Sequence, residues 1–402
     1  MKRVCYVFQD KYPWDVRVEK IMDSLANHGI EGHIMSKNQG SLPRAENLRD
    51  NLIVHRLPGF SSNFINTIVN MPAFFSPFWI FAIYQLVRKT AASLLIVRDL
   101  PLAPAALLAG KLSGCPVLMD MAENYPAMIR DTWKYRGPGK FDYLIRNPVL
   151  LGYMEKMVVP RLDGILAVSE YSKQRVAMLG MDPSRIWIVG NTPRLDQVGT
   201  GPAPSNPQVD QLNSLSSFIL MYTGGMEESR GLDIVIKALP EIHKTIPSAT
   251  FVIVGAGTSE SRLKALAEHL GVKDKVLFTG WVDNRDVPAM IKAADVCIVP
   301  HYVTEHTDTT IPNKIFDYML QRKPVVVTNS RSLSDIVSSS DCGKIYVHDN
   351  PIDLARKIVE LKDPLARKTY GDHGYEAVMT RYNWSFDEKN LFAALEISRP
   401  SR

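Results

Sequence analysis

The chain alternates short apolar runs with longer segments in which apolar residues recur every three or four positions. A short apolar run bounded by turn signals is typical of a buried strand, whereas the longer period is that of a helix packed on one face. In the first half we expect strands at 4–8, 31–36, 53–57, 94–97, 117–119 and 164–168, and helices at 15–27 and 102–112. Strands that alternate with helices predict a parallel, doubly wound sheet.

Between residues 191 and 217 the composition changes to Pro, Gly, Ser and Asn, which predicts a linker. The pattern then restarts, with strands expected at 219–222, 250–254, 276–278, 296–299 and 325–328, and helices at 232–244 and 260–270. We therefore predict an α/β protein of two doubly wound, Rossmann-like domains that face each other across a cleft. Their predicted ranges are 1–190 and 218–380, and residues 381–402 form a C-terminal helical segment for which packing back on the first domain is one open arrangement.

Three loops follow strands of the predicted second domain, so they share the sheet edge at which α/β proteins bind ligands. In the first loop, Gly224 and Gly225 permit close backbone approach to a ligand, and Arg230 could clamp a diphosphate. The second loop begins at Gly255 and lacks the third glycine of a dinucleotide fingerprint, so a nicotinamide site is weakly supported.

The third loop, residues 301–310, leads into a predicted helix with Pro312 in its first turn. The free N–H groups of a helix start favour an anion, Lys314 adds positive charge there, and Asp317 can accept hydrogen bonds from sugar hydroxyls. A phosphate beside a diol predicts a nucleotide site, whereas a solvated surface helix is the alternative. Three further residues around this helix start are predicted to contact the nucleotide: Thr309, Thr310 and Asn313.

A metal site is not predicted. His301, Glu305 and His306 are spaced H-x-x-x-E-H, one residue longer than the inverted zincin motif, and they lie on a loop that cannot align them by helical register. The four cysteines have no CxxC spacing and are interpreted as small core residues of a reducing compartment. We expect no cofactor to be required.

The net charge of +5 is concentrated in residues 1–190, which hold 23 Lys and Arg against 16 Asp and Glu. Such a surface suits an anionic membrane or acceptor, and without an aromatic-interleaved basic motif it does not predict nucleic-acid binding. Residues 57–87, which are uncharged from 58 to 86, either complete the core or lie at a membrane interface. Residues 133–146, with four basic and four aromatic side chains, are either an interfacial segment or a solvated loop.

The second domain resembles the donor-binding domain of retaining GT-B glycosyltransferases of the group 1 (GT4) family. The segments that carry this resemblance are Tyr222–Gly225, Arg230–Asp233, Val254–Gly257, Phe278–Val282, Ala294–Val296 and Pro312–Met319. The first domain is similar to the family more loosely, through Asp15–Val18, Asp99–Leu102, Asp120–Pro126 and Asp163–Glu170.

This resemblance implies transfer of a sugar from a nucleotide diphosphate donor, with retained anomeric configuration and no metal. It implies that Arg230 and Lys314 stabilise the leaving diphosphate and that Asp317 holds the nucleotide ribose. Val282 falls where the family's backbone meets the base, and Glu123 falls at the acceptor side and is implied to be catalytic.

The chain departs from the family at three positions. Thr309 stands where the family has its first glutamate, Gly225 where many relatives have an arginine, and Ala122 where a histidine precedes the acid. A catalytically weak or regulatory sugar-nucleotide binder, or a GT-B sugar-nucleotide epimerase, therefore remain as alternatives. Our main expectation is a cytoplasmic glycosyltransferase at the inner face of the membrane, which uses a UDP-sugar and a lipid-linked or surface-polysaccharide acceptor. No signal peptide is predicted, because Lys2 and Arg3 lead directly into the first strand.

Overall fold

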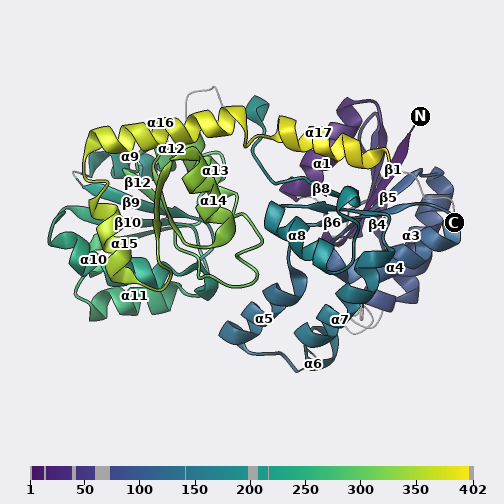
Figure 1. The fold of residues 1–402 in the computed structure, drawn as a ribbon, viewed down its shortest axis with the longest axis horizontal. Helices are drawn as coiled ribbons and strands as arrows, with labels where there is room; N and C mark the ends of the chain where they lie inside the picture. Colours follow the sequence, from purple (N-terminus) through teal and green to yellow (C-terminus); the bar gives the residue numbers. More distant parts are fainter. Residues whose placement is uncertain are drawn as a thin grey trace. The chain divides into compact units, whose positions relative to one another are not determined.

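The computed structural model describes residues 2–12, 15–38, 42–58, 73–140, 142–197, 207–215 and 217–397. The chain divides into two compact units. Unit 1 comprises Met1–Asn191 together with Asp387–Arg402, and unit 2 comprises Thr192–Phe386. Both units are α/β structures in which helices cover a largely parallel sheet (Figure 1).

Unit 1 is built on an eight-stranded sheet in the order β3-β4-β2-β1-β5-β6-β7-β8. Its strands are β1 (Arg3–Lys11), β2 (Glu31–Lys37), β3 (Ala45–Arg49), β4 (Leu52–Leu57), β5 (Leu94–Arg98), β6 (Val117–Met121), β7 (Gly164–Ala167) and β8 (Ile186–Ile188). All neighbours are parallel except β3, which runs antiparallel to β4. The central strands are buried on both faces, which is why their sequences are nearly continuous apolar runs.

The helices of unit 1 are α1 (Val16–Asn27), α3 (Pro77–Thr90), α4 (Asp99–Ser113), α5 (Tyr125–Arg136), α6 (Asp142–Ile145), α7 (Pro148–Val158), α8 (Glu170–Met178) and residues 387–395 of α17 (Trp384–Leu395). The start of α1 is fixed by Asp15, whose carboxylate accepts hydrogen bonds from the backbone N–H groups of Arg17 and Val18. Helix α17 contacts this unit through its Asn390 amide, which donates to the Ile188 carbonyl of β8 at 2.8 Å.

The predicted membrane segment 57–87 is only partly described, because residues 59–72 lie outside the described ranges. Residues 73–75 form a short 3₁₀ helix and residues 77–90 form α3. Trp79 and Ile83 of α3 are fully buried in the core of unit 1, whereas Phe75 and Phe81 are exposed. The described part of this segment therefore contributes to the core.

Unit 2 is built on a six-stranded parallel sheet in the order β11-β10-β9-β12-β13-β14. Its strands are β9 (Phe218–Thr223), β10 (Ala249–Val254), β11 (Val276–Gly280), β12 (Val296–Val299), β13 (Val325–Thr328) and β14 (Gly343–Tyr346). Its helices are α9 (Pro207–Ser214), α10 (Leu232–His243), α11 (Glu260–His269), α12 (Val287–Lys292), α13 (Lys314–Leu320), α14 (Arg331–Ser340), α15 (Pro351–Val359) and α16 (Pro364–Thr380).

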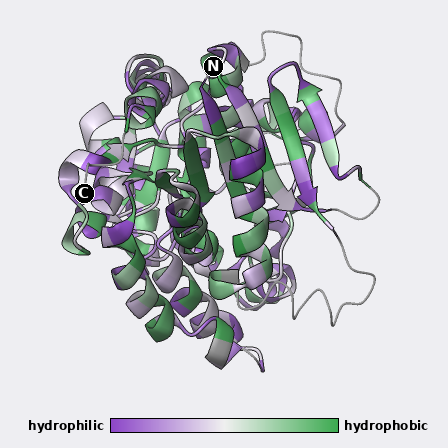
Figure 2. Ribbon diagram, turned by 90° about the vertical axis from the view of Figure 1, so that its right-hand side faces the viewer, coloured by the Kyte–Doolittle hydropathy of each residue, from purple (hydrophilic) through white to green (hydrophobic). Residues whose placement is uncertain are grey.

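Two apolar clusters cover the two faces of this second sheet. Helices α10, α11 and α15 contribute to one cluster, and α12, α13, α14 and α16 contribute to the other. In the sheet nearest the viewer in Figure 2, the middle strands are mostly green, the colour of hydrophobic residues. Within the stretch predicted as a linker, residues 207–214 form α9, whose Leu212 is buried in the second cluster.

The predicted fold class is confirmed. The predicted and observed elements differ at the ends of helices and at the edges of the sheets. Helix α4 begins at Asp99 instead of residue 102, and α13 begins at Lys314, so the prediction that Pro312 lies in its first turn is wrong. Strands β3, β8 and β14 were not predicted; each is short and lies at or next to a sheet edge, where the apolar signal is weak. Within the described ranges, every helix is too short or too polar to cross a bilayer.

Candidate active site

The loops after β9, β10 and β12 meet at one edge of the unit 2 sheet, as the parallel order requires. The chain winds outward from β9 through β10 to β11, and then in the other direction from β12 to β14. Ligands of open α/β sheets bind outside the carboxyl ends of the strands where this direction changes. The predicted donor loops therefore lie at the topological switch point of this unit.

Glycines bring these loops into backbone contact. The N–H of Gly224 donates to Val254 at 2.8 Å, and a Cβ at Gly255 would lie 2.2 Å from the Gly224 carbonyl oxygen. Because Gly255 has no side chain, the loops after β9 and β10 can lie in direct backbone contact. Gly225 is more open, since a Cβ there would meet only the Ala256 carbonyl oxygen, at 4.0 Å.

Gly231 links the first loop to the third. It adopts a left-handed conformation with φ of +64°, and a Cβ there would lie 2.0 Å from the Pro300 carbonyl oxygen at the end of β12. Only glycine fits both constraints.

We therefore expect Gly231→Ala to separate the two loops. Left-handed strain alone costs about 1–2 kcal/mol, and relieving the clash displaces the neighbouring Arg230. Thermal unfolding and nucleotide titration should show lower stability and at least tenfold weaker binding. Gly271→Ala is the matched control, because Gly271 has φ of +66° but its Cβ would meet no atom within 4 Å. Equal effects of the two substitutions would contradict this role of Gly231.

Three basic side chains converge where these loops meet. The Arg230 guanidinium nitrogen Nη1 lies 3.4 Å from Nδ1 of the buried His301. Lys314 lies with Nζ 3.7 Å from the centre of the Tyr222 ring, and 2.9 Å from where a Cβ on Gly224 would stand. The structure thus brings together two of the predicted catalytic residues beside the predicted glycine loop.

This cluster is electrostatically unfavourable without an anion. Burial, together with the positive charge of Arg230, lowers the pKa of Lys314 well below its ordinary value, although Asp317 opposes the shift. Burial and the charges of Lys314 and Arg230 likewise lower the pKa of His301. Among the described residues, neither Arg230 nor Lys314 forms an ion pair with a carboxylate. An anionic ligand would relieve this repulsion.

The other predicted donor residues lie on the same segments with different surroundings. Thr309 is buried and donates its hydroxyl to the carbonyls of Glu305 and His306, so that the hydroxyl closes a turn inside the loop. The Thr310 hydroxyl also donates to His306, at 3.1 Å. Asn313 and Asp317 are exposed at the start of α13, and Val282 is buried after β11. The family-implied roles of these residues stay predictions.

The H-x-x-x-E-H segment does not gather its three side chains around a common point. His301 is buried against Arg230, whereas the backbones of Glu305 and His306 accept the threonine hydroxyls of the loop. Within the described ranges, no group of three or more His, Cys, Asp or Glu side chains is arranged to hold a metal ion.

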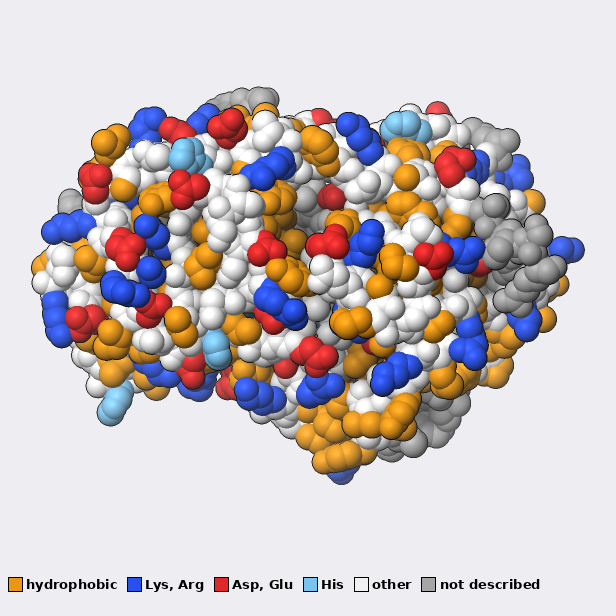
Figure 3. Space-filling model, viewed as in Figure 1, with side chains coloured by type: hydrophobic (Ala, Val, Ile, Leu, Met, Phe, Trp, Pro, Cys, Tyr) orange, Lys and Arg blue, Asp and Glu red, His pale blue; other side chains and the backbone are white. Residues whose placement is uncertain are grey.

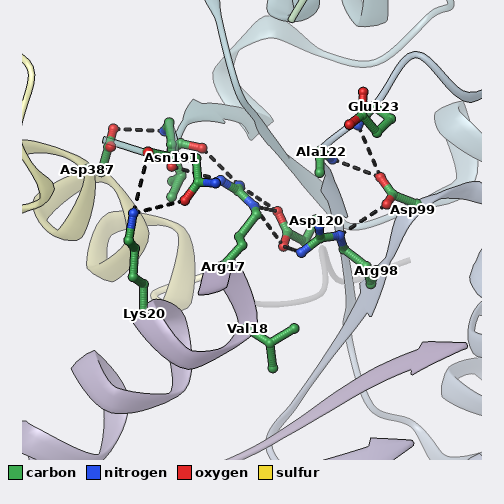
Figure 4. Close-up of polar contacts among 12 residues, drawn as sticks. Arg17, Val18, Lys20, Arg98, Asp99, Asp120, Ala122, Glu123, Asn191 and Asp387 are labelled. Carbon is green, nitrogen blue, oxygen red and sulfur yellow. Dashed lines mark hydrogen bonds and ion pairs between the residues drawn. The ribbon is translucent and has the colours of Figure 1, made fainter. Parts of the chain in front are cut away.

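Unit 1 contains a buried ionic network around Asp120 of β6, and Figure 4 shows its charged residues Arg17, Arg98 and Asp120. The Arg17 guanidinium donates to both carboxylate oxygens of Asp120, at 2.6–3.0 Å, and Tyr6 donates its hydroxyl to the same carboxylate at 2.5 Å. Arg17 and Asp120 are both essentially inaccessible to solvent. Although burial alone would raise it, the charges of Arg17 and Arg98 hold the pKa of Asp120 below its ordinary value.

The same arginine holds the chain where unit 1 continues into unit 2. Arg17 also donates to the carbonyls of Val189 and Gly190, at 2.8 and 2.7 Å. The N–H of Gly190 in turn donates to the Asp387 carboxylate of α17 at 2.8 Å (Figure 4). One buried guanidinium therefore fixes both the carboxyl end of β6 and the exit of the chain from this unit.

Asp99 positions the loop that carries the predicted Glu123. It has a left-handed φ of +54°, which is uncommon for a residue other than glycine. Its Oδ1 accepts hydrogen bonds from the N–H groups of Ala122 and Glu123, and its Oδ2 accepts one from Arg98 at 3.0 Å (Figure 4). Burial raises the pKa of Asp99 to about 6, with the charge of Glu123 adding to the shift and that of Arg98 opposing it. Backbone strain that is held by several contacts is typical of functional sites.

Sequence reasoning missed this network in unit 1. Arg17 and Asp120 appeared only within segments that carry the family resemblance. A usable signal was present, because Arg17 lies one helical turn before the buried Ile21 on the apolar face of α1. A charged residue on such a face predicts a buried partner.

Comparison with known proteins decides the family. The profile described as Glycosyltransferase Family 4 matches residues 15–196, and the profile described as Glycosyl transferases group 1 matches residues 217–363. The chain belongs to the group 1 glycosyltransferases.

Curated relatives of this glycosyltransferase include a 2-deoxystreptamine glucosyltransferase of Streptomyces kanamyceticus, 23% identical over 87% of this chain and 89% of that protein. A phosphatidyl-myo-inositol mannosyltransferase of Mycobacterium leprae is 26% identical over 62% of this chain and 61% of that protein. Among solved structures, Anabaena Alr3699/HepE in complex with UDP matches with a TM-score of 0.72 and 14% identity, over 98% of this glycosyltransferase and 99% of that chain. The last similarity supports the GT-B fold.

Proposed function

We propose that this group 1 glycosyltransferase transfers a sugar from a nucleotide diphosphate donor, with UDP-sugar favoured, to a lipid-linked or surface-polysaccharide acceptor. The observation that carries the proposal is the convergence of Arg230 and Lys314 beside the glycine loop at the switch point of unit 2. Two cations held close together without carboxylate partners suit a ligand with two adjacent negative charges. The UDP bound to the similar Anabaena protein supports the choice of base.

In this proposal the protein cations stabilise the leaving group. As the bond between the anomeric carbon and the phosphate oxygen breaks, negative charge grows on the diphosphate, and Arg230 and Lys314 are placed to stabilise it without a metal ion. The acceptor hydroxyl then attacks from the side of the departing diphosphate, which retains the anomeric configuration. A departing phosphate oxygen takes the hydroxyl proton, so that no protein base is needed.

Unit 1 is proposed to supply the acceptor side. Asp99 and the loop with Glu123 lie at the carboxyl ends of the unit 1 strands, and the strained backbone and raised pKa of Asp99 support this proposal. A lipid-linked acceptor is supported by the similarity to a phosphatidyl-myo-inositol mannosyltransferase and would bring the protein to the inner face of the membrane.

The test is calorimetric titration of the protein with UDP-, GDP-, ADP- and dTDP-sugars, in EDTA and then in magnesium. We expect one nucleotide class to bind with micromolar affinity and the affinity to be the same in both buffers. Binding only in magnesium would contradict metal-independent donor binding. Binding of a nucleotide with another base would contradict the preference for UDP. If none of these nucleotides binds, the proposed function is wrong.

Product analysis separates transfer from its alternatives. With a membrane extract as acceptor source, a transferase releases the nucleoside diphosphate and labels lipid or glycan with retained configuration. A regulatory binder would release nothing, and an epimerase would change the sugar while it is still attached to the nucleotide. Arg230→Ala should lose transfer activity. Its matched control Arg322→Ala should retain it, because Arg322 lies in the same unit but pairs with Asp372 on its surface.

A further inference from the structure

An unusual concentration of exposed apolar side chains lies on α7 of unit 1. Val149, Leu150, Tyr153 and Met157 are each at least half exposed, at 62%, 50%, 63% and 54%. Their spacing places all four on one side of the helix, which we call the α7 patch. Apolar side chains that gather on one helix face indicate an interaction site.

The fold does not need the α7 patch for its own core. The opposite face of α7 carries Leu151, Glu155 and Val158, which are buried. Leu151 packs with Phe74, Leu100 and Ile129 in a small apolar cluster that anchors α7 to unit 1. Glu155 accepts two hydrogen bonds from Arg175, at 2.8 and 2.9 Å. The helix is therefore held by its inner face, and the α7 patch is left to solvent.

Exposed basic side chains lie on α7 and directly before and after it. Residues 125–161, which contain α5, α6 and α7, hold seven Lys and Arg against three Asp and Glu, and one of those three is the buried Glu155. Lys156 is exposed on α7 itself, and Arg146 and Arg161 are exposed just before and after the helix. Figure 3 shows hydrophobic and basic side chains together at the lower edge of the molecule, where Figure 1 labels these three helices.

Aromatic side chains extend this surface into the predicted segment 133–146. Tyr143 of α6 is 62% exposed, and its ring lies 5.2 Å from that of Trp133 on α5. Exposed apolar, aromatic and basic side chains on neighbouring helices are the composition of segments that lie in the headgroup region of a membrane.

We propose that the α7 patch and its basic rim dock unit 1 onto the surface of an anionic lipid bilayer. Val149, Leu150, Tyr153 and Met157 would enter the headgroup region, and Lys156, Arg146 and Arg161 would contact anionic lipid headgroups. A second copy of this chain fits the surface poorly, because a two-fold interface would bring the same basic rims against each other. This docking deepens the proposed transfer to a lipid-linked acceptor, and it rests on that function for the choice of partner.

The test is co-sedimentation of the full chain with vesicles of phosphatidylcholine, with and without 30% phosphatidylglycerol. We expect the protein to bind the anionic vesicles and to dissociate as salt rises. The triple substitution Leu150→Ser, Tyr153→Ser and Met157→Ser should lower the partition coefficient at least tenfold. Lys156→Glu should lower it about fivefold or more, because a basic residue near an anionic membrane surface contributes about 1 kcal/mol, which corresponds to roughly a fivefold change in partitioning.

Matched controls come from unit 2. Leu365→Ser removes a leucine of α16 that is even more exposed than Leu150, at 69%, and Lys292→Glu reverses an exposed lysine of α12. Both should leave vesicle binding unchanged. Failure of the wild-type protein to bind anionic vesicles, or equal losses in the α7 and control variants, would overturn the proposal. A wild-type dimer that the triple substitution converts to a monomer, without vesicle binding, would assign the patch to a second copy.

Nucleotide titration of the same preparations keeps the two proposals separate. Loss of vesicle binding with intact nucleotide binding would overturn the docking surface alone. Vesicle binding without any nucleotide binding would overturn the proposed function and leave the docking surface standing.

Discussion

Replacing Lys314 by methionine is expected to weaken binding of the nucleotide diphosphate 10- to 100-fold and to lower kcat/KM more than 100-fold. The Nζ atom of Lys314 stands against the Tyr222 ring and the Gly224 backbone, so the ammonium group is held at the point where the diphosphate is proposed to lie. A charge-assisted hydrogen bond contributes about 1.5–3 kcal/mol to binding, and a preorganised donor contributes more when charge grows on the leaving group.

The protonation of Lys314 gives this prediction a second readout. Burial and Arg230 lower its pKa well below the ordinary value in the free protein. A bound diphosphate favours the charged amine and raises that pKa, so binding takes up a proton and the affinity falls as pH rises between the two pKa values. Calorimetry in buffers of different ionisation enthalpy measures the proton uptake that accompanies binding. This uptake should be absent in Lys314→Met.

Lys323→Met is the matched control for this lysine. Lys323 is also partly buried in unit 2, and burial lowers its pKa too, but it lies after α13, beside Asp295 and Arg367. We expect its substitution to leave nucleotide affinity and proton uptake unchanged. Unaltered nucleotide binding by Lys314→Met would refute the placement of the diphosphate.

Asp120→Ala is expected to destabilise unit 1 by about 3–5 kcal/mol, because it leaves Arg17 buried without its counter-charge. At roughly 2–4 °C per kcal/mol for a unit of this size, the melting temperature should fall by about 10 °C. Thermal unfolding followed by calorimetry measures the effect on each unit. The exposed pair Asp23–Arg49 supplies the control, since Asp23→Ala should cost about 1 kcal/mol or less.

The stability lost on substitution of Asp120 by alanine should depend on pH and should become smaller as the pH falls. The folded-state pKa of Asp120 is held below the unfolded value by Arg17 and Arg98, despite burial. Its contribution to stability is therefore fully present above the unfolded pKa of about 4, and it is lost as pH falls through the folded pKa. The difference in unfolding free energy between wild type and Asp120→Ala should shrink on acidification. A difference that is independent of pH would contradict the ionic origin.

The fold could be predicted from sequence because its central strands are buried on both faces. Runs such as 94–97 and 296–299 are continuously apolar, which leaves little ambiguity about strand and sheet class. Edge strands such as β3 are exposed and polar, so their pairing depends on neighbours that the local pattern does not reveal. The start of α4 was missed because Asp99 begins it in a left-handed conformation, and the local sequence does not reveal the contacts that Asp99 makes with the loop after β6.

The candidate site was predicted to different extents in the two units. In unit 2, glycines and basic residues lie in loops directly after strands, so the topology alone brings Arg230 and Lys314 together. In unit 1, Arg17 reaches Asp120 and Gly190 across more than 100 residues of sequence, and no local spacing encodes such a pairing. Likewise, the internal hydrogen bonds of Thr309 follow from the path of its loop.

The bond between Gly190 and Asp387 has a consequence for the order of folding during synthesis. Unit 2 lies in sequence between Asn191 and Asp387, so the ribosome completes it before α17 emerges. Until then unit 1 lacks the carboxylate that accepts from Gly190, the Asn390 amide that donates to Ile188, and the Leu395 carbonyl that accepts from Lys2. The unit that is translated first is therefore the unit whose contacts are completed last.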